Sequence, residues 1–113
     1  MKYKVEFSQI VRRKMKDLKL YLTEQFGAET ATKSLKLILE AATSLADFPL
    51  KGASLAALFD IETDFRTLYV KHNYLFYYIE GERIIISEMF DEREDFMFRL
   101  FGMRTASSDE NGL

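Results

Sequence analysis

The chemistry open to this chain is that of arginine, lysine, tyrosine and carboxylate side chains. Cysteine is absent, which excludes disulfides, thiolate nucleophiles and every zinc site that needs sulfur. A single histidine, His72, excludes histidine-rich metal clusters. The five glycines never stand in the order of a dinucleotide-binding loop, a P-loop or a hydrolase nucleophile elbow. We therefore expect no metal and no organic cofactor.

Charge is distributed unevenly along the sequence. The chain has 16 basic and 18 acidic side chains, a net charge of −2. Residues 1–36 carry nine Lys or Arg and four Asp or Glu, net +5, whereas residues 37–113 carry seven and fourteen, net −7. The overall balance argues against a nucleic-acid partner, but a near-neutral protein can still present a basic face.

Length and composition predict one globular domain. The chain has 113 residues, 48% hydrophobic and 14% aromatic, which supports one core and excludes a disordered chain. The longest apolar run, residues 74–79, is far shorter than the roughly 20 residues that cross a bilayer, and no segment resembles a signal peptide. We expect a soluble, cytoplasmic protein without membrane association. Its domain should span residues 1–104, followed by a disordered polar tail at 105–113.

Residue spacing predicts a strand and then two helices. Residues 2–8 alternate apolar and polar side chains, as a half-buried strand does. From Ser8 the apolar residues recur every three or four positions, which predicts a helix that Ser8 caps and Gly27 ends. The same spacing resumes after Gly27 until Pro49 forbids a helix. Helices joined by so short a link pack as an antiparallel hairpin.

The second half of the sequence predicts a meander of strands. Residues 50–64 lack clear periodicity and are interpreted as a loop, although 54–59 could make a single helical turn. Segments rich in β-branched and aromatic residues follow at 65–71, 74–80 and 83–90. Tight turns at His72-Asn73 and Gly81 join them in antiparallel order. A short helix is predicted at 95–101.

These elements predict an α+β fold. The N-terminal strand and the two-helix antiparallel hairpin should pack on a three- to four-stranded, mainly antiparallel sheet, because neither layer can bury its apolar face alone. A short C-terminal helix completes the fold.

Three sequence strings carry a family resemblance. They are KYKVEFS at the start, LADFP after the second predicted helix, and DFRTLYVKHNYLFYYIEGERIIISEMFDERED across the meander. The last string holds an arginine near the start of a strand (Arg66), an NY…FY strand (residues 73–78) and an R-x-D cluster at Arg93. Over residues 2 to about 101 the chain resembles the RelE/ParE superfamily of bacterial toxins, which includes the plasmid stabilisation proteins.

The resemblance implies a stress-responsive toxin of a type II toxin-antitoxin system. Such a toxin is neutralised by a cognate antitoxin that wraps its surface, in a hetero-oligomer. RelE-like members cleave messenger RNA on the ribosome, whereas ParE-like members poison DNA gyrase by binding it. A third possibility is an inactive module that only binds antitoxin. Fold alone does not choose among these activities.

RNA cleavage without metal would need cations and proton donors around the reacting phosphate. The resemblance assigns phosphate binding to Arg66 and Arg93, because arginine pairs two phosphate oxygens and stays charged. Tyr74 or Tyr78 could stack a base or donate a proton. Each has a structural alternative. Arg66 could brace the loop through the carboxylates of Asp60, Glu62 or Asp64, Arg93 could form a local ion pair, and the tyrosines could cover the sheet.

Further basic side chains could contact phosphate or a protein partner. They are Arg12, Arg13, Lys16 and Lys19 on the first predicted helix, together with Lys51 and Lys71. A solvated helix face is the simpler interpretation of the first four. His72 lies in a predicted turn, where a lone histidine is more often exposed than catalytic.

Family frequency ranks a ribosome-dependent, metal-independent endoribonuclease slightly ahead of a gyrase inhibitor. Two features of the sequence favour the inhibitor. Ribosome-directed members are strongly basic, yet the sheet half of this chain is net −7. Phe96 and Phe98 also stand where several RNA-cleaving relatives place a terminal histidine or tyrosine.

Overall fold

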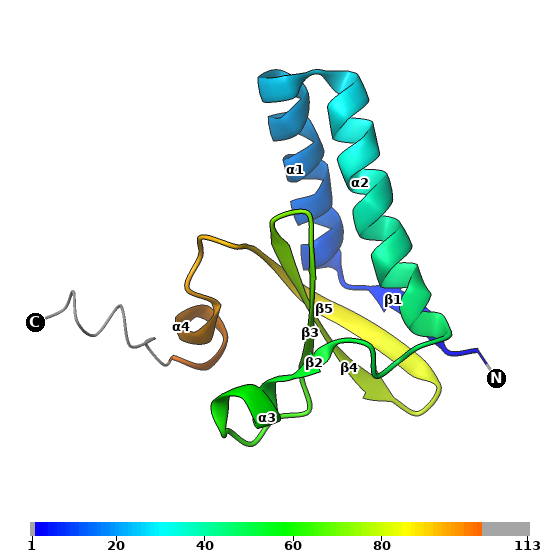
Figure 1. Cartoon of the computed structure of the whole chain (residues 1–113), viewed down its shortest axis with the longest axis vertical. Helices are drawn as coiled ribbons and strands as arrows, with labels where there is room; N and C mark the ends of the chain where they lie inside the picture. The colour runs from blue at the N-terminus through cyan, green and yellow to red at the C-terminus, as the bar shows by residue number, and fades with distance from the viewer. Residues whose placement is uncertain (1, 103–113) are drawn as a thin grey trace, which may run out of the picture.

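A long helical hairpin covers one face of a mixed β-sheet, and two short helices lie at the other face (Figure 1). The computed structural model describes residues 2–102. The elements are β1 (Lys4–Phe7), α1 (Gln9–Phe26), α2 (Ala28–Thr43), the 3-10 helix η1 (Ser44–Ala46), β2 (Ala53–Ser54), α3 (Leu55–Phe59), β3 (Arg66–Val70), β4 (Asn73–Glu80), β5 (Arg83–Asp91) and α4 (Phe96–Phe101). The predicted α+β class is confirmed. The predicted tail at 105–113 and the boundary at 104 lie outside the described residues.

The sheet has five strands in the order β1-β5-β4-β3-β2. β1 runs parallel to β5, with Val5 opposite Ile84, and the other neighbours are antiparallel. A parallel neighbour requires a long crossover, and the α1–α2 hairpin supplies part of it. The sheet therefore has one strand more than predicted, the two-residue β2.

Ser8 links the start of α1 to the middle of the sheet. Its hydroxyl accepts the Val11 backbone N–H at 3.1 Å, which caps the helix as predicted. The same hydroxyl donates to the Ser87 carbonyl at 3.0 Å. Ser87 is the extra residue of a bulge, because Phe76 pairs with Glu88 whereas Tyr77 pairs with Ile86. No sequence pattern predicted this bulge.

β4 is buried on both faces. Leu75 and Tyr77 point into the core beneath the helical hairpin, whereas Tyr74 and Phe76 point into a second core on the opposite face. The first core also contains side chains from the two long helices and from β3 and β5, namely Val11, Ile38, Ala42, Leu45, Leu68, Ile84, Ile86 and Met89. The strand predicted at 74–80 is confirmed, and its side chains alternate between the two cores.

Residues 50–64 are not an unbroken loop: residues 53–54 form a strand that was not predicted, and the single helical turn left open at 54–59 is present as α3. Ala53 and Ser54 pair with Thr67 and Arg66 as β2. The Ser54 hydroxyl then accepts the Ala57 backbone N–H at 3.3 Å and caps the one-turn helix α3. A two-residue strand has no alternation to detect, which explains the missed element. Among the described residues, no helix is long and apolar enough to span a bilayer.

Replacement of Ser8 by alanine tests the link between helix and sheet. Ser8→Ala removes the helix cap and the bond to the bulge, and should lower the free energy of unfolding by about 1–2 kcal/mol. Urea denaturation measures the change. Thr23→Ala is the matched control, because the Thr23 hydroxyl bonds only a carbonyl of its own helix and is exposed. A loss equal to the control would contradict the role assigned to Ser8.

Candidate partner-binding site

A cleft of about 440 Å³ opens between the helical hairpin and the β3–β4 turn. Its helical wall is mainly apolar and includes Leu18, Leu22 and Phe26. Its opposite rim carries charged and polar side chains from the turn and from the end of β5, namely Lys71, His72, Asn73, Asp91, Glu92 and Arg93. An apolar wall beside a charged rim suits an amphipathic segment of a protein.

The β3–β4 turn is held in an uncommon backbone conformation. Lys71 and His72 both have left-handed geometry, with φ of 48° and 66°. A tight hairpin turn requires such angles, which cost on the order of 1 kcal/mol or more at each non-glycine residue. The buried Asn73 side chain donates to the Lys71 carbonyl at 2.7 Å. A turn was predicted at His72-Asn73; the structure has it one residue earlier, at Lys71-His72, with Asn73 already paired to Val70 in β4. The turn borders the cleft.

Glu92 fixes this turn from the end of β5. Its backbone N–H donates to the His72 carbonyl at 2.8 Å. Its carboxylate accepts the Tyr69 hydroxyl at 2.5 Å and lies 2.7 Å from His72 Nδ1. The bonds from Tyr69 and His72 lower the pKa of Glu92, and the bond to Glu92 raises the pKa of Tyr69. No pattern in the sequence indicated this contact; Glu92 was visible there only as one of the acids beside Arg93.

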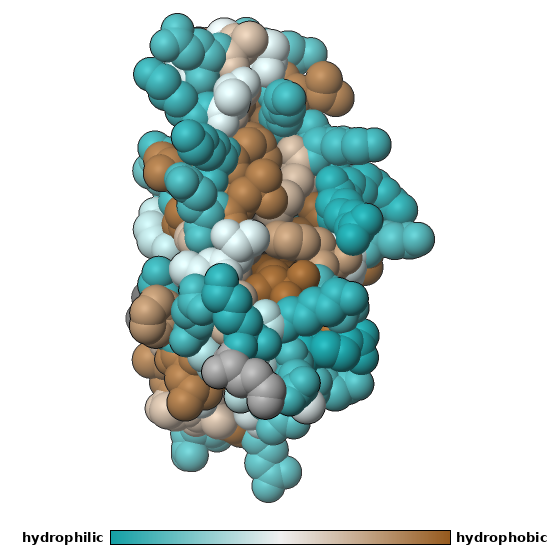
Figure 2. All heavy atoms as spheres, turned by 90° about the vertical axis from the view of Figure 1, so that its right-hand side faces the viewer, coloured by the Kyte–Doolittle hydropathy of each residue, from teal (hydrophilic) through white to brown (hydrophobic). Residues whose placement is uncertain are grey.

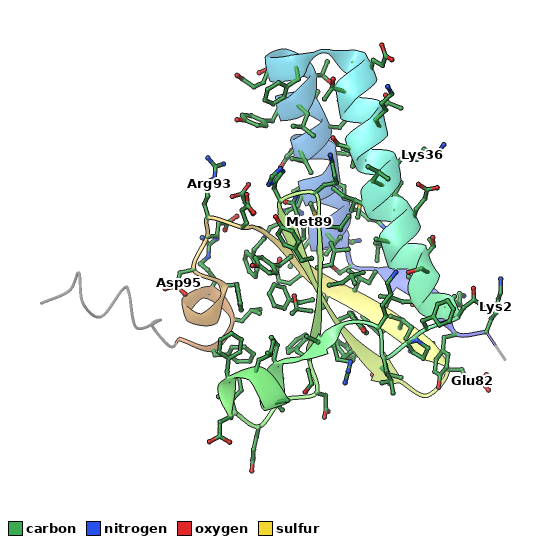
Figure 3. The ribbon with its side chains drawn as sticks, in the orientation of Figure 1. Lys2, Lys36, Glu82, Met89, Arg93 and Asp95 are labelled. Atoms are coloured by element: carbon green, nitrogen blue, oxygen red, sulfur yellow. The ribbon has the colours of Figure 1, made fainter. Side chains whose placement is uncertain are left out.

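Arg93 forms the local ion pair that was one of its two interpretations. Its Nε donates to Asp91 Oδ1 at 2.9 Å, and its backbone N–H donates to the same oxygen at 2.9 Å. These bonds lower the pKa of Asp91 and raise the pKa of Arg93. The Arg93 side chain is 81% exposed and points away from the sheet (Figure 3). It therefore remains accessible to a partner at the rim of the cleft.

Arg66 braces the preceding loop, but through carbonyls and not through the expected carboxylates. Its Nε donates to the Gly52 carbonyl at 3.0 Å, and its Nη2 donates to the Leu50 carbonyl at 3.2 Å. No described bond joins Arg66 to Asp60, Glu62 or Asp64. Sequence could not reveal this partner, because a carbonyl is present at every residue.

The two arginines lie at different levels of the sheet. Arg66 pairs with Tyr77, whereas Arg93 follows Asp91, which pairs with Asn73. Tyr77 and Asn73 are four residues apart on β4, about 13 Å at the rise of an extended strand. No described contact links the two guanidinium groups. The structure thus does not bring Arg66 and Arg93 together.

Tyr74 and Tyr78 pack on the face opposite the helical hairpin. The Tyr74 ring centroid lies 5.1 Å from that of Tyr69 and 5.2 Å from that of Phe96. The Tyr78 ring meets Phe65 edge to face at 5.8 Å. Covering the sheet, the structural alternative, is therefore what both rings do. Among the described residues, neither tyrosine forms a hydrogen bond or a cation–π pair with Arg66 or Arg93.

The other basic candidates are dispersed. Arg12 Nε donates to the Phe7 carbonyl at 3.2 Å, and Lys51 Nζ donates to Ser44 Oγ at 3.2 Å. Three more residues of α1 are exposed and have no ion pair among the described residues, namely Arg13, Lys16 and Lys19. Of these six basic candidates, only Lys71 lines the cleft, where it joins Arg93.

Lys14 makes a contact between helix and sheet that the sequence did not predict. Its Nζ lies 2.8 Å from Glu88 Oε1 and 4.2 Å from the Phe90 ring centroid, so it ties α1 to β5. Within residues 2–102 no three acidic, histidine or cysteine side chains gather as a possible metal site.

A model of the family described as "ParE toxin of type II toxin-antitoxin system, parDE" matches residues 5–96. The chain belongs to this family. Among solved structures, a chain described as "Chromosomal ParDE TA system from P. aeruginosa" matches with a TM-score of 0.66 and 17% identity, over 79% of this chain and 95% of that chain. No curated protein matches. This ParE toxin therefore has a cognate antitoxin as its partner.

Replacement of Arg66 and replacement of Arg93 should have different effects on the stability of the toxin. Arg66→Ala removes two charge-assisted bonds to carbonyls and should lower the free energy of unfolding by about 1.5–3 kcal/mol. Arg93→Ala breaks an exposed ion pair and should leave the urea midpoint unchanged within error. Urea denaturation of both variants gives the comparison. Equal losses would contradict the separate roles.

The Glu92 contact predicts a pH-dependent stability. A carboxyl with a lowered folded-state pKa stabilises the fold above its unfolded pKa of about 4.3, and that contribution is lost as pH falls through the lowered value. Glu92→Gln should therefore have a lower urea midpoint than the wild type at pH 7, with the difference shrinking by pH 3. Glu82→Gln, an exposed carboxyl without a described partner, serves as control. A difference independent of pH would refute this account.

Proposed function

We propose that this toxin acts by binding a target protein, DNA gyrase, and not by cleaving RNA. The observation that supports this function is that each of the four candidate catalytic side chains is held by partners within the fold. Arg66 is bonded to the loop before β2, Arg93 to Asp91, and Tyr74 and Tyr78 pack against other rings. A binding toxin needs no assembled catalytic group, and gyrase is the target associated with the ParE branch.

The charge of the molecule supports the same function. RNA binding depends on neutralising phosphates with lysine and arginine. Residues 80–95, which span β5 and the segments at both of its ends, contain seven acidic side chains and only two basic ones. Acidic side chains do not weaken a protein–protein interface when the partner is complementary.

Purified toxin and gyrase provide the test. Supercoiling of relaxed plasmid should fall as toxin is added at micromolar concentration, and the cognate antitoxin should restore it. Translation of a reporter message in a cell-free system should proceed at an unchanged rate, without cleavage of ribosome-bound message.

The opposite pair of results would support the ribonuclease predicted first from family frequency. Cleaved message with normal supercoiling would reject gyrase binding as the activity. Normal supercoiling and intact message together would support an inactive module.

A further inference from the structure

β1 lies at an edge of the sheet, and only its β5 side is paired. The strand is found beside the lower end of α2, at the side of the molecule where the N-terminus lies (Figure 1). That side presents mostly hydrophilic side chains, with hydrophobic ones gathered in a few places (Figure 2). An edge strand offers its unpaired backbone groups to any other extended chain. The outer edge of β1 is therefore a surface on which another strand can pair.

The backbone groups of β1 alternate between the two sides of the strand. The N–H groups of Lys4 and Ser8 donate to carbonyls on the β5 side, at 2.8 and 3.0 Å. Because successive residues of a strand direct their N–H and C=O groups to opposite sides, the groups of Val5 and Phe7 face the outer edge. These two residues are the part of β1 that a second strand would meet.

Two contacts close the ends of this outer edge. At one end the Tyr3 N–H donates to the Ala46 carbonyl of η1 at 2.9 Å. At the other end Arg12 Nε donates to the Phe7 carbonyl at 3.2 Å. Between them, no bond from the described residues reaches the Val5 N–H, the Val5 carbonyl or the Phe7 N–H. Arg12 thus holds the one further acceptor that a pairing strand needs.

The open groups of the edge are complementary to those of a second copy of the chain. In an antiparallel pair whose twofold axis passes by Glu6, Val5 lies opposite Phe7 of the second copy. The Val5 N–H then donates to that Phe7 carbonyl, the Phe7 N–H of the second copy donates to the Val5 carbonyl, and the axis repeats both bonds. This register uses every open group and ends where η1 and α1 begin. Such a pair is closed at two chains.

The charges of the edge permit this register. It places Glu6 opposite Glu6 of the second copy, and like charges directly opposite one another are destabilising. Each Glu6 is already paired within its own chain, because Arg83 Nε lies 2.7 Å from Glu6 Oε2 and Arg83 Nη2 lies 3.0 Å from Glu6 Oε1. This ion pair lowers the pKa of Glu6. The two carboxylates therefore meet as neutralised pairs.

We propose that the outer edge of β1 is a strand-pairing surface for a second copy of the toxin, and that Arg12 keeps this surface closed. Two of the four bonds between the copies need the Phe7 carbonyl. The donor of a neighbouring strand would lie about 2.9 Å from that oxygen, where Arg12 Nε lies now, so Arg12 and a second strand exclude one another. The inference is independent of gyrase binding, and it gives Arg12 a role other than contact with phosphate.

The mass of the purified toxin, measured by analytical ultracentrifugation over a range of concentrations, tests the role of Arg12. Arg12→Ala should form dimers at a concentration roughly tenfold lower than the wild type does, because it frees two backbone bonds. Arg12→Met keeps the length of the side chain without a donor and should behave alike. Arg13→Ala is the matched control, since it removes the same charge from an exposed neighbour without a described bond. All three should keep the wild-type melting temperature.

Amide hydrogen exchange, followed by NMR, locates the surface. In the Arg12→Ala dimer the Val5 and Phe7 N–H groups should exchange at least tenfold more slowly than in the same variant diluted to single chains. The Glu6 N–H, which faces β5, should exchange at the same rate in both samples.

Each part of the proposal has a result that overturns it. If Arg12→Ala and Arg12→Met remain single chains wherever the wild type does, Arg12 does not close the edge. If Arg13→Ala associates equally, loss of charge and not of the bond is the cause. Association without slower exchange at Val5 and Phe7 would reject the edge of β1 as the surface. None of these results depends on supercoiling, so either proposal can fail while the other stands.

Discussion

The structure depends on burying both faces of β4. Leu75 and Tyr77 face the helical hairpin, and Tyr74 and Phe76 face the opposite core, so a protein with only one covering layer would leave a row of aromatic rings in water. The hairpin covers the first face, and α3 with α4 covers the second. β4 also pairs on both sides, with β3 and β5. The strand therefore fixes the position of every other element, including the two ends at which the toxin can be contacted.

The same strand separates the charged groups that a nuclease would have to combine. Arg66 lies beside Tyr77, where the ring hydroxyl and the guanidinium together bind the loop before β2. Arg93 lies beyond the other end of β4. There Asp91 binds the Arg93 guanidinium, and Glu92 binds His72 of the β3–β4 turn. Each arginine satisfies a neighbouring polar group. A site assembled from both would have to break these bonds first, with no described group to replace them.

Sequence predicted the elements whose residues repeat and missed those that depend on single contacts. The composition of β4 and the apolar spacing in α1 and α2 are sustained over most of each element, so the strand and both helices were predicted. β2 has two residues and the Ser87 bulge has one, too few for any period. The Glu92 contact joins a turn to a strand end that is remote in sequence. Spacing carries no information about such a pair.

Arg66 shows why a correct family assignment did not give its role. A guanidinium offers parallel N–H donors that match two oxygens, whether these belong to a phosphate or to two backbone carbonyls. The sequence around position 66 is compatible with either. What decides between them is the path of residues 50–52, which brings two carbonyls within 3.2 Å of the side chain. That path depends in turn on Gly52, where only a residue without a side chain can pass between the Thr67 carbonyl and the Tyr77 ring.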